Sequence, residues 1–155
     1  MDLLPNDSET LVVSKSAGQV LHLLNKASAS QNVVYDEHEH AKKLFVGNVH
    51  HHSFHLSIRP KRPNSYIPVM SGEVESTSSG SIVFVTYKLF PSTRQYLSLW
   101  SLFVVAVGIV GGVQLSAFYL PASCILILLL IHYIAWANFR MQVRISRDIL
   151  MKALA

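Results

Sequence analysis

Histidine is concentrated in one short stretch of the chain, HEHAKKLFVGNVHHHSFHL, in which residues 38 to 56 carry six of the eight histidines. Zinc and copper sites usually need three or four ligands that converge at a defined spacing. If the segment is extended, His50 and His52 lie on the same side of it, about 6 to 7 Å apart. His55 then points to the polar face of the next segment. A metal site built from His38 or His40 together with His50 and His52 is therefore geometrically possible.

The residues around these histidines do not favour a metal site. No carboxylate or cysteine stands at a recognised ligand spacing, and no H-x-x-x-H motif lies on a predicted helix. A solvated hairpin tip at residues 50 to 52 is the interpretation we adopt. A pH response is a further possibility, because crowded imidazoles titrate together. We predict no metal ion and no cofactor, and keep His38, His40, His50, His52 and His55 as candidates for metal binding or pH sensing.

Patterns typical of enzymes are also missing from the sequence. There is no paired carboxylate, no nucleophile with a base at a readable spacing and no glycine-rich phosphate loop. The isoelectric point of about 9.3 comes largely from basic residues that flank an apolar run. A membrane surface explains these charges better than nucleic acid does. We therefore predict that the chain is not an enzyme and does not bind nucleic acid.

The apolar run that carries no charge, between Tyr96 and Arg140, is the strongest pattern in the chain. Its two parts, about 97–120 and about 122–139, would form helices of roughly 36 and 27 Å, which suits a bilayer core of about 30 Å. Pro121 marks the turn between them. Two helices buried in a soluble fold are the alternative, but a chain this short has too little mass to cover both. The pattern predicts a transmembrane helical hairpin over residues 94–139.

Basic residues on both sides of the hairpin set its expected orientation. Lys and Arg precede the first span and follow the second, and the turn has none, so the positive-inside rule places both termini in the cytoplasm. Residues 140–155 are predicted to form an amphipathic helix with an apolar stripe of Met141, Ile145, Ile149 and Leu154. This helix either lies along anionic lipid headgroups, through Arg140, Arg144 and Arg147, or packs on the preceding domain.

Small and polar residues inside the spans suggest how the helices pack. Gly108 and Gly112 form a G-x-x-x-G spacing, which lets helices approach closely, either within the hairpin or between protomers of a homo-oligomer. Gln114 and His132 are the strongly polar side chains near the spans. We expect them to bond a neighbouring helix, although a channel or transporter subunit would use them to line a path.

The residues before the hairpin predict a helix followed by strands. Residues 1–32 contain a helix with Ser14 as its expected N-cap and a polar linker. Residues 33–93 are the expected cytoplasmic β-meander domain, and from Lys43 the pattern has period two in LFVGNV, SFHLSIRP, NSYIPVMSGEVES and GSIVFVTYKLF. The expected fold class is an α+β membrane protein, with an N-terminal helix, a four-stranded antiparallel meander, the transmembrane hairpin and the C-terminal amphipathic helix.

The stretch from residue 44 to 139 resembles a family of small uncharacterised bacterial membrane proteins. The family has a strand ending in G-x-V, then F-x-L, an arginine-containing turn, N-S-Y-x-P-V-x-G and a glycine-bearing turn before the membrane. The matching residues are Gly47, Val49, Phe54, Leu56, Arg59, Arg62, Asn64, Ser65, Tyr66, Pro68, Val69, Gly72, Gly80, Phe90 and Pro91. The resemblance implies this architecture and a bacterial inner-membrane location, and it implies no activity.

Three functions are compatible with these patterns. A membrane-anchored cytoplasmic binding or scaffold module, which contacts membrane lipid and an unknown protein partner, fits best. The alternative is a metal- or pH-responsive membrane protein that uses the histidine-rich hairpin. The third, a channel or transporter subunit, has few polar residues with which to line a path.

Overall fold

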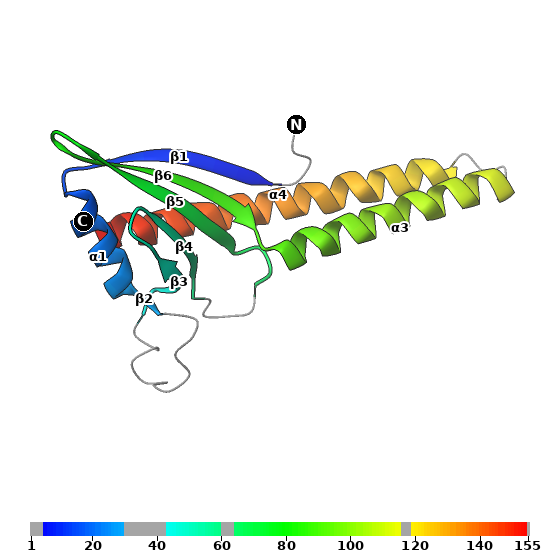
Figure 1. Ribbon diagram of the computed structural model, residues 1–155. Coiled ribbons are helices and arrows are strands. Elements are labelled where there is room, and N and C mark those ends of the chain that lie inside the picture. Colours follow the sequence, from blue (N-terminus) through cyan, green and yellow to red (C-terminus); the bar gives the residue numbers. More distant parts are fainter. Residues whose placement is uncertain (1–4, 30–42, 60–63, 116–118, 155) are drawn as a thin grey trace.

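The computed structural model describes residues 5–29, 43–59, 64–115 and 119–154, with the backbone alone for residues 114 and 115. Within these residues, six strands form one sheet in the order β1-β6-β5-β4-β3-β2, and three helices accompany it (Figure 1). The elements in chain order are β1 (Asn6–Val13), α1 (Ala17–Ala27), β2 (Ser28–Ala29), β3 (Phe45–Val49), β4 (Ser53–Ile58), β5 (Pro68–Thr77), β6 (Gly80–Leu89), α3 (Pro91–Leu115) and α4 (Tyr119–Leu154).

The α+β class and the antiparallel meander are confirmed, but the predicted number of four strands is wrong. Strands β3 to β6 pair in sequence, each antiparallel to the next. The two additional strands lie at the sheet's edges, where β1 pairs antiparallel with β6 and β2 pairs parallel with β3. Local pattern did not reveal β1, because NDSETLVV is polar and acidic over its first half. Pairing with β6, over the full length of β1, makes this segment a strand.

Helix α1 begins two residues later than predicted. Ser16, not Ser14, is the N-cap, because its hydroxyl accepts from the backbone N–H of Gln19 while the Gln19 side chain accepts from the Ser16 N–H. This reciprocal pair is a capping box. Ser14 instead belongs to the turn that leaves β1. The helix buries Ala17, Val20 and Leu24 against the sheet.

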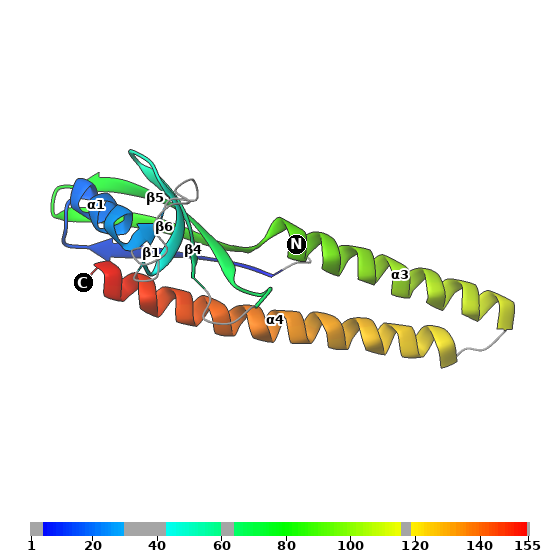
Figure 2. The same ribbon diagram turned by 90° about the horizontal axis from the view of Figure 1, so that it is seen from below.

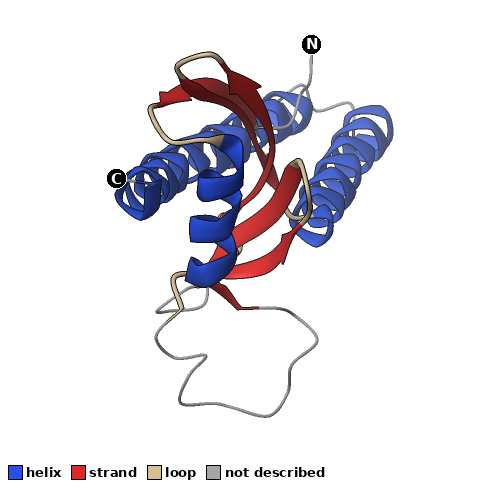
Figure 3. Ribbon diagram, turned by 60° about the vertical axis from the view of Figure 1, so that its left-hand side comes forward, coloured by secondary structure: helices blue, strands red, loops and turns tan. Residues whose placement is uncertain are grey.

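One face of the sheet, here the inner face, is covered by α1 and by the second half of α4. Figure 3 shows α1 lying across the strands, and both helices contribute to one core with Leu56, Met70 and Val85. Helix α4 is continuous over 36 residues, so the predicted C-terminal helix is the end of the second apolar helix and no separate element. It packs on the domain upstream, which is the second of the two placements expected for it.

The buried stripe of α4 differs from the predicted one. Its members recur every three or four residues: Ala135, Phe139, Val143, Ser146, Leu150 and Leu154. Met141 and Ile145, which were predicted to be in the stripe, are 52% and 42% exposed. Two neighbouring rows of this helix are apolar enough to form a stripe, and contact with the sheet selects the row that begins at Ala135.

Helices α3 and α4 run side by side away from the sheet (Figure 2). Both are long and apolar enough to cross a membrane, with mean hydropathies of 2.0 and 2.1 in their most apolar windows. Only 11% and 6% of those windows are buried inside the protein. A core helix of a soluble domain would be mostly buried, so these two helices present their apolar side chains outward.

Gly72 in the centre of the sheet is required by a close contact across the strands. A Cβ atom at this position would lie 2.3 Å from Cζ of Phe54 and 2.7 Å from the backbone oxygen of Phe84. The backbone oxygen cannot move without breaking the β5–β6 pairing. The ring of Phe54, the cross-strand partner of Gly72, therefore fills the space that a side chain would need.

We predict that Gly72→Ala lowers the free energy of unfolding by about 1 to 3 kcal/mol, because the new methyl group overpacks the core. The matched control is Gly18→Ala in α1, where a Cβ would meet no atom within 4 Å. Alanine is the better helix former, so this control should be neutral or slightly stabilising. Thermal unfolding of the detergent-solubilised proteins measures both. Equal midpoints for the two variants would contradict the contact at Gly72.

Candidate functional site

A pocket of about 500 Å³ opens on the sheet face that points away from α1 and α4, here the outer face. Side chains alternate between the two faces of a strand. Phe45 and Leu56 therefore point to the core, whereas their neighbours Val46 and Ser57 point outward and face each other across β3 and β4. The pocket's apolar lining comes from Val46, Ile67, Val69 and Phe90, and its polar lining from Asn48, His55, Ser57 and Asn64. Leu56 and Ile58 of β4 also border it, although their side chains point to the opposite face. We call it the outer-face pocket.

The wall between β5 and α3 is built by the segment before β5. Asn64 Oδ1 accepts a hydrogen bond of 2.9 Å from the backbone N–H of Tyr66, which fixes the turn. Thr93, in the first turn of α3, donates from Oγ1 to the Ser65 oxygen at 2.9 Å. The turn is thereby held against the helix, and Ile67 is buried beneath it. These two hydrogen bonds thus hold this wall of the outer-face pocket in place.

Several residues that carry the family resemblance lie at turns, at strand ends or at close backbone contacts. Asn64 bonds the local backbone, as predicted for this turn, and Pro68 is the first residue of β5, where a missing N–H is tolerated. Gly47 has a φ of +146°, and a Cβ there would lie 2.0 Å from the His55 oxygen. Gly80 follows the two-residue turn between β5 and β6 with a φ of +153°. Six of the residues that carry the resemblance also line the outer-face pocket: Gly47, Leu56, Asn64, Val69, Phe90 and Pro91.

His50, His51, His52 and His55 lie on the first hairpin of the meander, as the sequence predicted. His50 to His52 form the turn between β3 and β4, which is held by hydrogen bonds from His50 N to Ser53 O and from Val74 N to His52 O. His38 and His40 lie outside the described residues. Among the residues that are described, no group of three or more His, Cys, Asp or Glu side chains is arranged to hold a metal ion.

His55 forms a polar contact that sequence patterns did not reveal. Its Nδ1 and the Oγ of Ser71 share a hydrogen bond of 2.8 Å across β4 and β5. A serine beside a histidine can act as a nucleophile when backbone N–H groups stabilise the oxyanion that forms. Ser71, however, pairs with His55 on one side and Thr86 on the other, so strand pairing uses the backbone amides around it. His55 lines the outer-face pocket, so the hydrogen-bonded pair stands beside it.

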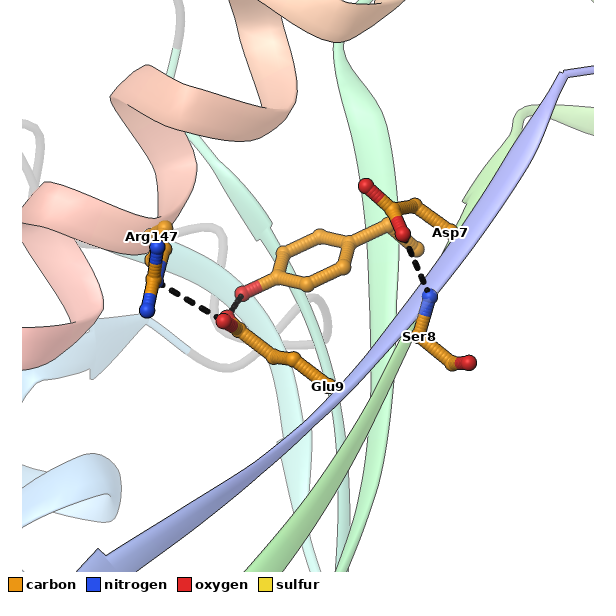
Figure 4. Close-up of polar contacts among 5 residues, drawn as sticks. Asp7, Ser8, Glu9 and Arg147 are labelled. Atoms are coloured by element: carbon orange, nitrogen blue, oxygen red, sulfur yellow. Dashed lines mark hydrogen bonds and ion pairs between the residues drawn. The ribbon is translucent and has the colours of Figure 1, made fainter.

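On the inner face, an ion pair joins β1 to α4. Arg147 Nε lies 2.8 Å from Glu9 Oε2, and Figure 4 shows the two side chains pointing toward each other. The other carboxylate oxygen of Glu9 accepts a 2.5 Å hydrogen bond from the hydroxyl of Tyr87 in β6. Burial, and then the hydrogen bond and charge of Glu9, raise the pKa of Tyr87 well above its usual range. We call these three residues the inner-face latch.

The basic residues that were predicted to contact anionic lipid have different surroundings. Arg147 belongs to the inner-face latch, with a side chain that is 56% exposed. Arg140 lies over the ring of Trp136, with its guanidinium carbon 4.1 Å from the ring centroid. Arg144 is exposed on the same side of α4 as Arg140, beside a surface hollow that both residues line. Lipid contact by these residues stays a prediction.

The glycines of the G-x-x-x-G spacing face the neighbouring helix of the same chain. A Cβ at Gly108 would lie 3.2 Å from Cβ of Cys124, and one at Gly112 would lie 2.8 Å from Cγ of Pro121. This matches the first of the two packing roles expected for them, and a homo-oligomer through this face stays a prediction. His132 bonds within α4, from Nδ1 to the Leu128 oxygen at 3.0 Å, and not to the neighbouring helix as expected. The side chain of Gln114 lies outside the described part.

Comparisons with known proteins found no family model, no curated protein and no solved structure that matches the chain.

We predict that Tyr87→Phe lowers the free energy of unfolding by about 1 kcal/mol at neutral pH, because Glu9 loses a partly buried hydrogen bond. The pH dependence should also change. Since the folded state raises the pKa of Tyr87, the unfolded state loses this proton first as the pH rises above about 10, and wild-type stability falls there. The variant should lack this component.

Urea unfolding of both proteins is measured from about pH 8 to about pH 11, and the difference between their free energies of unfolding is compared at each pH. Other groups that titrate in this range contribute equally to the stability of both proteins, so they do not affect the difference. Parallel stability curves over the whole range would contradict the buried position of the Tyr87 hydroxyl.

Proposed function

We propose that this chain is a membrane-anchored binding module. Helices α3 and α4 cross the bilayer as a hairpin and hold the sheet domain at the cytoplasmic surface, where the outer-face pocket and the adjoining strands receive a ligand or partner. The observation that carries the proposal is the exposure of two long apolar helices that are joined directly to a well-packed domain.

The exposed side chains of the hairpin favour a bilayer over water. Leu99, Leu102 and Ile109 on α3 are 62–70% exposed, and Leu126 and Leu129 on α4 are 68% and 64% exposed. A contiguous apolar surface of this kind is rare on a soluble monomer and marks contact with a membrane or a protein. The chain has no charged residue between Tyr96 and Arg140, which is what the interior of a bilayer requires.

Aromatic and basic residues support a definite position in the membrane. Tyr96 and Trp100 on α3, and Tyr133 and Trp136 on α4, stand near the domain ends of the apolar runs, where interfacial aromatic residues gather. Arg140 beside Trp136 fits the same level. The basic residues that flank the hairpin favour a cytoplasmic sheet domain. The resemblance to bacterial membrane proteins would make this the inner membrane.

A binding role suits the domain better than catalysis or metal sensing. The outer-face pocket has an apolar lining with polar side chains at its rim, which is typical of sites that hold a ligand. The neighbouring Ser71 and His55 lie within paired strands, without the arrangement that acyl transfer needs. The described histidines form a turn and a strand-pair contact, so they do not favour the metal-responsive alternative.

The topology can be tested by cysteine accessibility, because Cys124 is the chain's single cysteine. In a Cys124→Ser background, cysteines are introduced by Tyr119→Cys at the turn end of the hairpin and by Lys152→Cys at the far end of α4. Both positions are exposed. In intact bacterial cells, a membrane-impermeant maleimide should label the Tyr119→Cys protein, and label the Lys152→Cys protein only after the membrane is opened.

A matched control places the probe on the sheet domain by Ser78→Cys, in the exposed turn between β5 and β6. Like the Lys152→Cys protein, the Ser78→Cys protein should be labelled only after the membrane is opened. Labelling of all three proteins from the same side would overturn the hairpin topology. Release of the wild-type protein from membranes by alkaline carbonate would overturn the anchor itself.

A further inference from the structure

We propose that the outer-face pocket binds an acyl chain of an anionic phospholipid drawn from the adjoining bilayer. The inference rests on the proposed function, because α3 and α4 must first place the domain at a membrane. It adds the chemical class of the ligand and the route by which it arrives.

The position of the pocket is the first argument. Phe90 and Pro91 line it, and Pro91 is the first residue of α3. Tyr96, which begins the uncharged run, follows five residues later, or about 8 Å along the helix axis. The pocket mouth therefore lies within the headgroup region of a bilayer that α3 crosses. A lipid can reach it without leaving the membrane.

The chemistry of the lining is the second argument. Val46, Ile67 and Val69 offer aliphatic surface, and Phe90 is 38% exposed beside them. Among the described residues that line the pocket, none is acidic. A cavity of about 500 Å³ with this lining suits a hydrocarbon chain, whose burial gains about 0.8 kcal/mol for each methylene.

Positive charge beside the pocket favours a lipid with an anionic headgroup. Lys88 is the cross-strand partner of Val69, so its exposed side chain stands on the outer face next to the pocket wall. Arg94 is exposed one turn into α3, where its N–H bonds the Phe90 oxygen. A phosphate at the mouth would meet both cations while its chain occupies the pocket. Each basic residue near a membrane surface strengthens anionic lipid binding.

The test uses the full-length protein in vesicles that contain phosphatidylglycerol with a diazirine at the end of one acyl chain. Chain ends normally lie near the bilayer midplane, roughly 15 Å from either edge of the hydrocarbon core. Label on peptides from β3, β4 or residues 64–69 therefore requires a chain inside the pocket. Mass spectrometry after irradiation should find this label in addition to label on α3 and α4.

Two substitutions on the same sheet face give a matched pair. Val46→Trp fills the pocket and should lower pocket labelling by about tenfold, because the chain loses its apolar contacts. Val12→Trp places the same residue on β1, where Val12 is 82% exposed and far from the pocket in the sheet order. It should leave labelling unchanged. Both proteins should keep the wild-type label on the spans.

The headgroup is tested with the same photoreactive chain on phosphatidylcholine, which should label the pocket less than phosphatidylglycerol does. Lys88→Ser together with Arg94→Ser should remove this difference, and Lys152→Ser, at the far end of α4, should preserve it. Equal pocket labelling by the two lipids in the wild type would overturn the selection of anionic headgroups.

The inference and the proposed function fail differently. Label on the spans without label on the pocket peptides would overturn acyl-chain binding and leave the anchor standing. An absence of label from both the spans and the pocket would overturn the anchor, and the lipid site with it. Pocket labelling that survives Val46→Trp would overturn the assignment of the site.

Discussion

The packing of the second half of α4 against the sheet is the contact on which the rest of the structure depends. Phe139, Val143 and Leu150 pack into one core with Met70, Val85 and Tyr87 on the inner face, which α4 covers together with α1. A sheet with an uncovered apolar face is not stable alone. The same helix continues without a break to Tyr119, so one rod of about 54 Å joins the core to the far end of the apolar hairpin. The position of the domain relative to the hairpin follows from this continuity.

Polar contacts give that packing a unique register. Apolar rows on a helix can slide by one turn at modest cost, because the residues in each row are chemically alike. The pairing of Arg147 with Glu9 and the Lys15 hydrogen bond to the Leu154 oxygen are satisfied in one alignment only. Lys15 also places a positive charge at the C-terminus of α4, where the helix dipole is negative. Burial supplies most of the stability, and these contacts determine how α4 lies on β1, β6 and the turn before α1.

Local patterns in the sequence predicted those parts of the fold that are determined locally. The alternation in residues 45–58 and 68–89 predicted four strands, and Asn64 predicted a turn that its hydrogen bond confirms. The helical hairpin was also predicted, but its turn was misplaced: Pro121 lies in the first turn of α4 (Tyr119–Leu154), where a proline is tolerated, and α3 already ends at Leu115. Contacts between distant segments decided the rest. Strand β1 exists because β6 pairs with it, and the stripe on α4 is chosen by the sheet. The outer-face pocket joins residues from β3, β4, the segment before β5 and the start of α3, and no local pattern brings these together.

The route of the chain has a consequence for the order of folding. The core combines β1 with the last turns of α4. Between these two segments the chain runs away from the sheet along α3 and returns along α4. During synthesis the inner face of the sheet is covered by α1 alone until the second half of α4 has been made and has folded back onto it. Closing a loop of this size is slow compared with local pairing. The sheet domain can therefore be completed only after α3 and α4 have formed their hairpin.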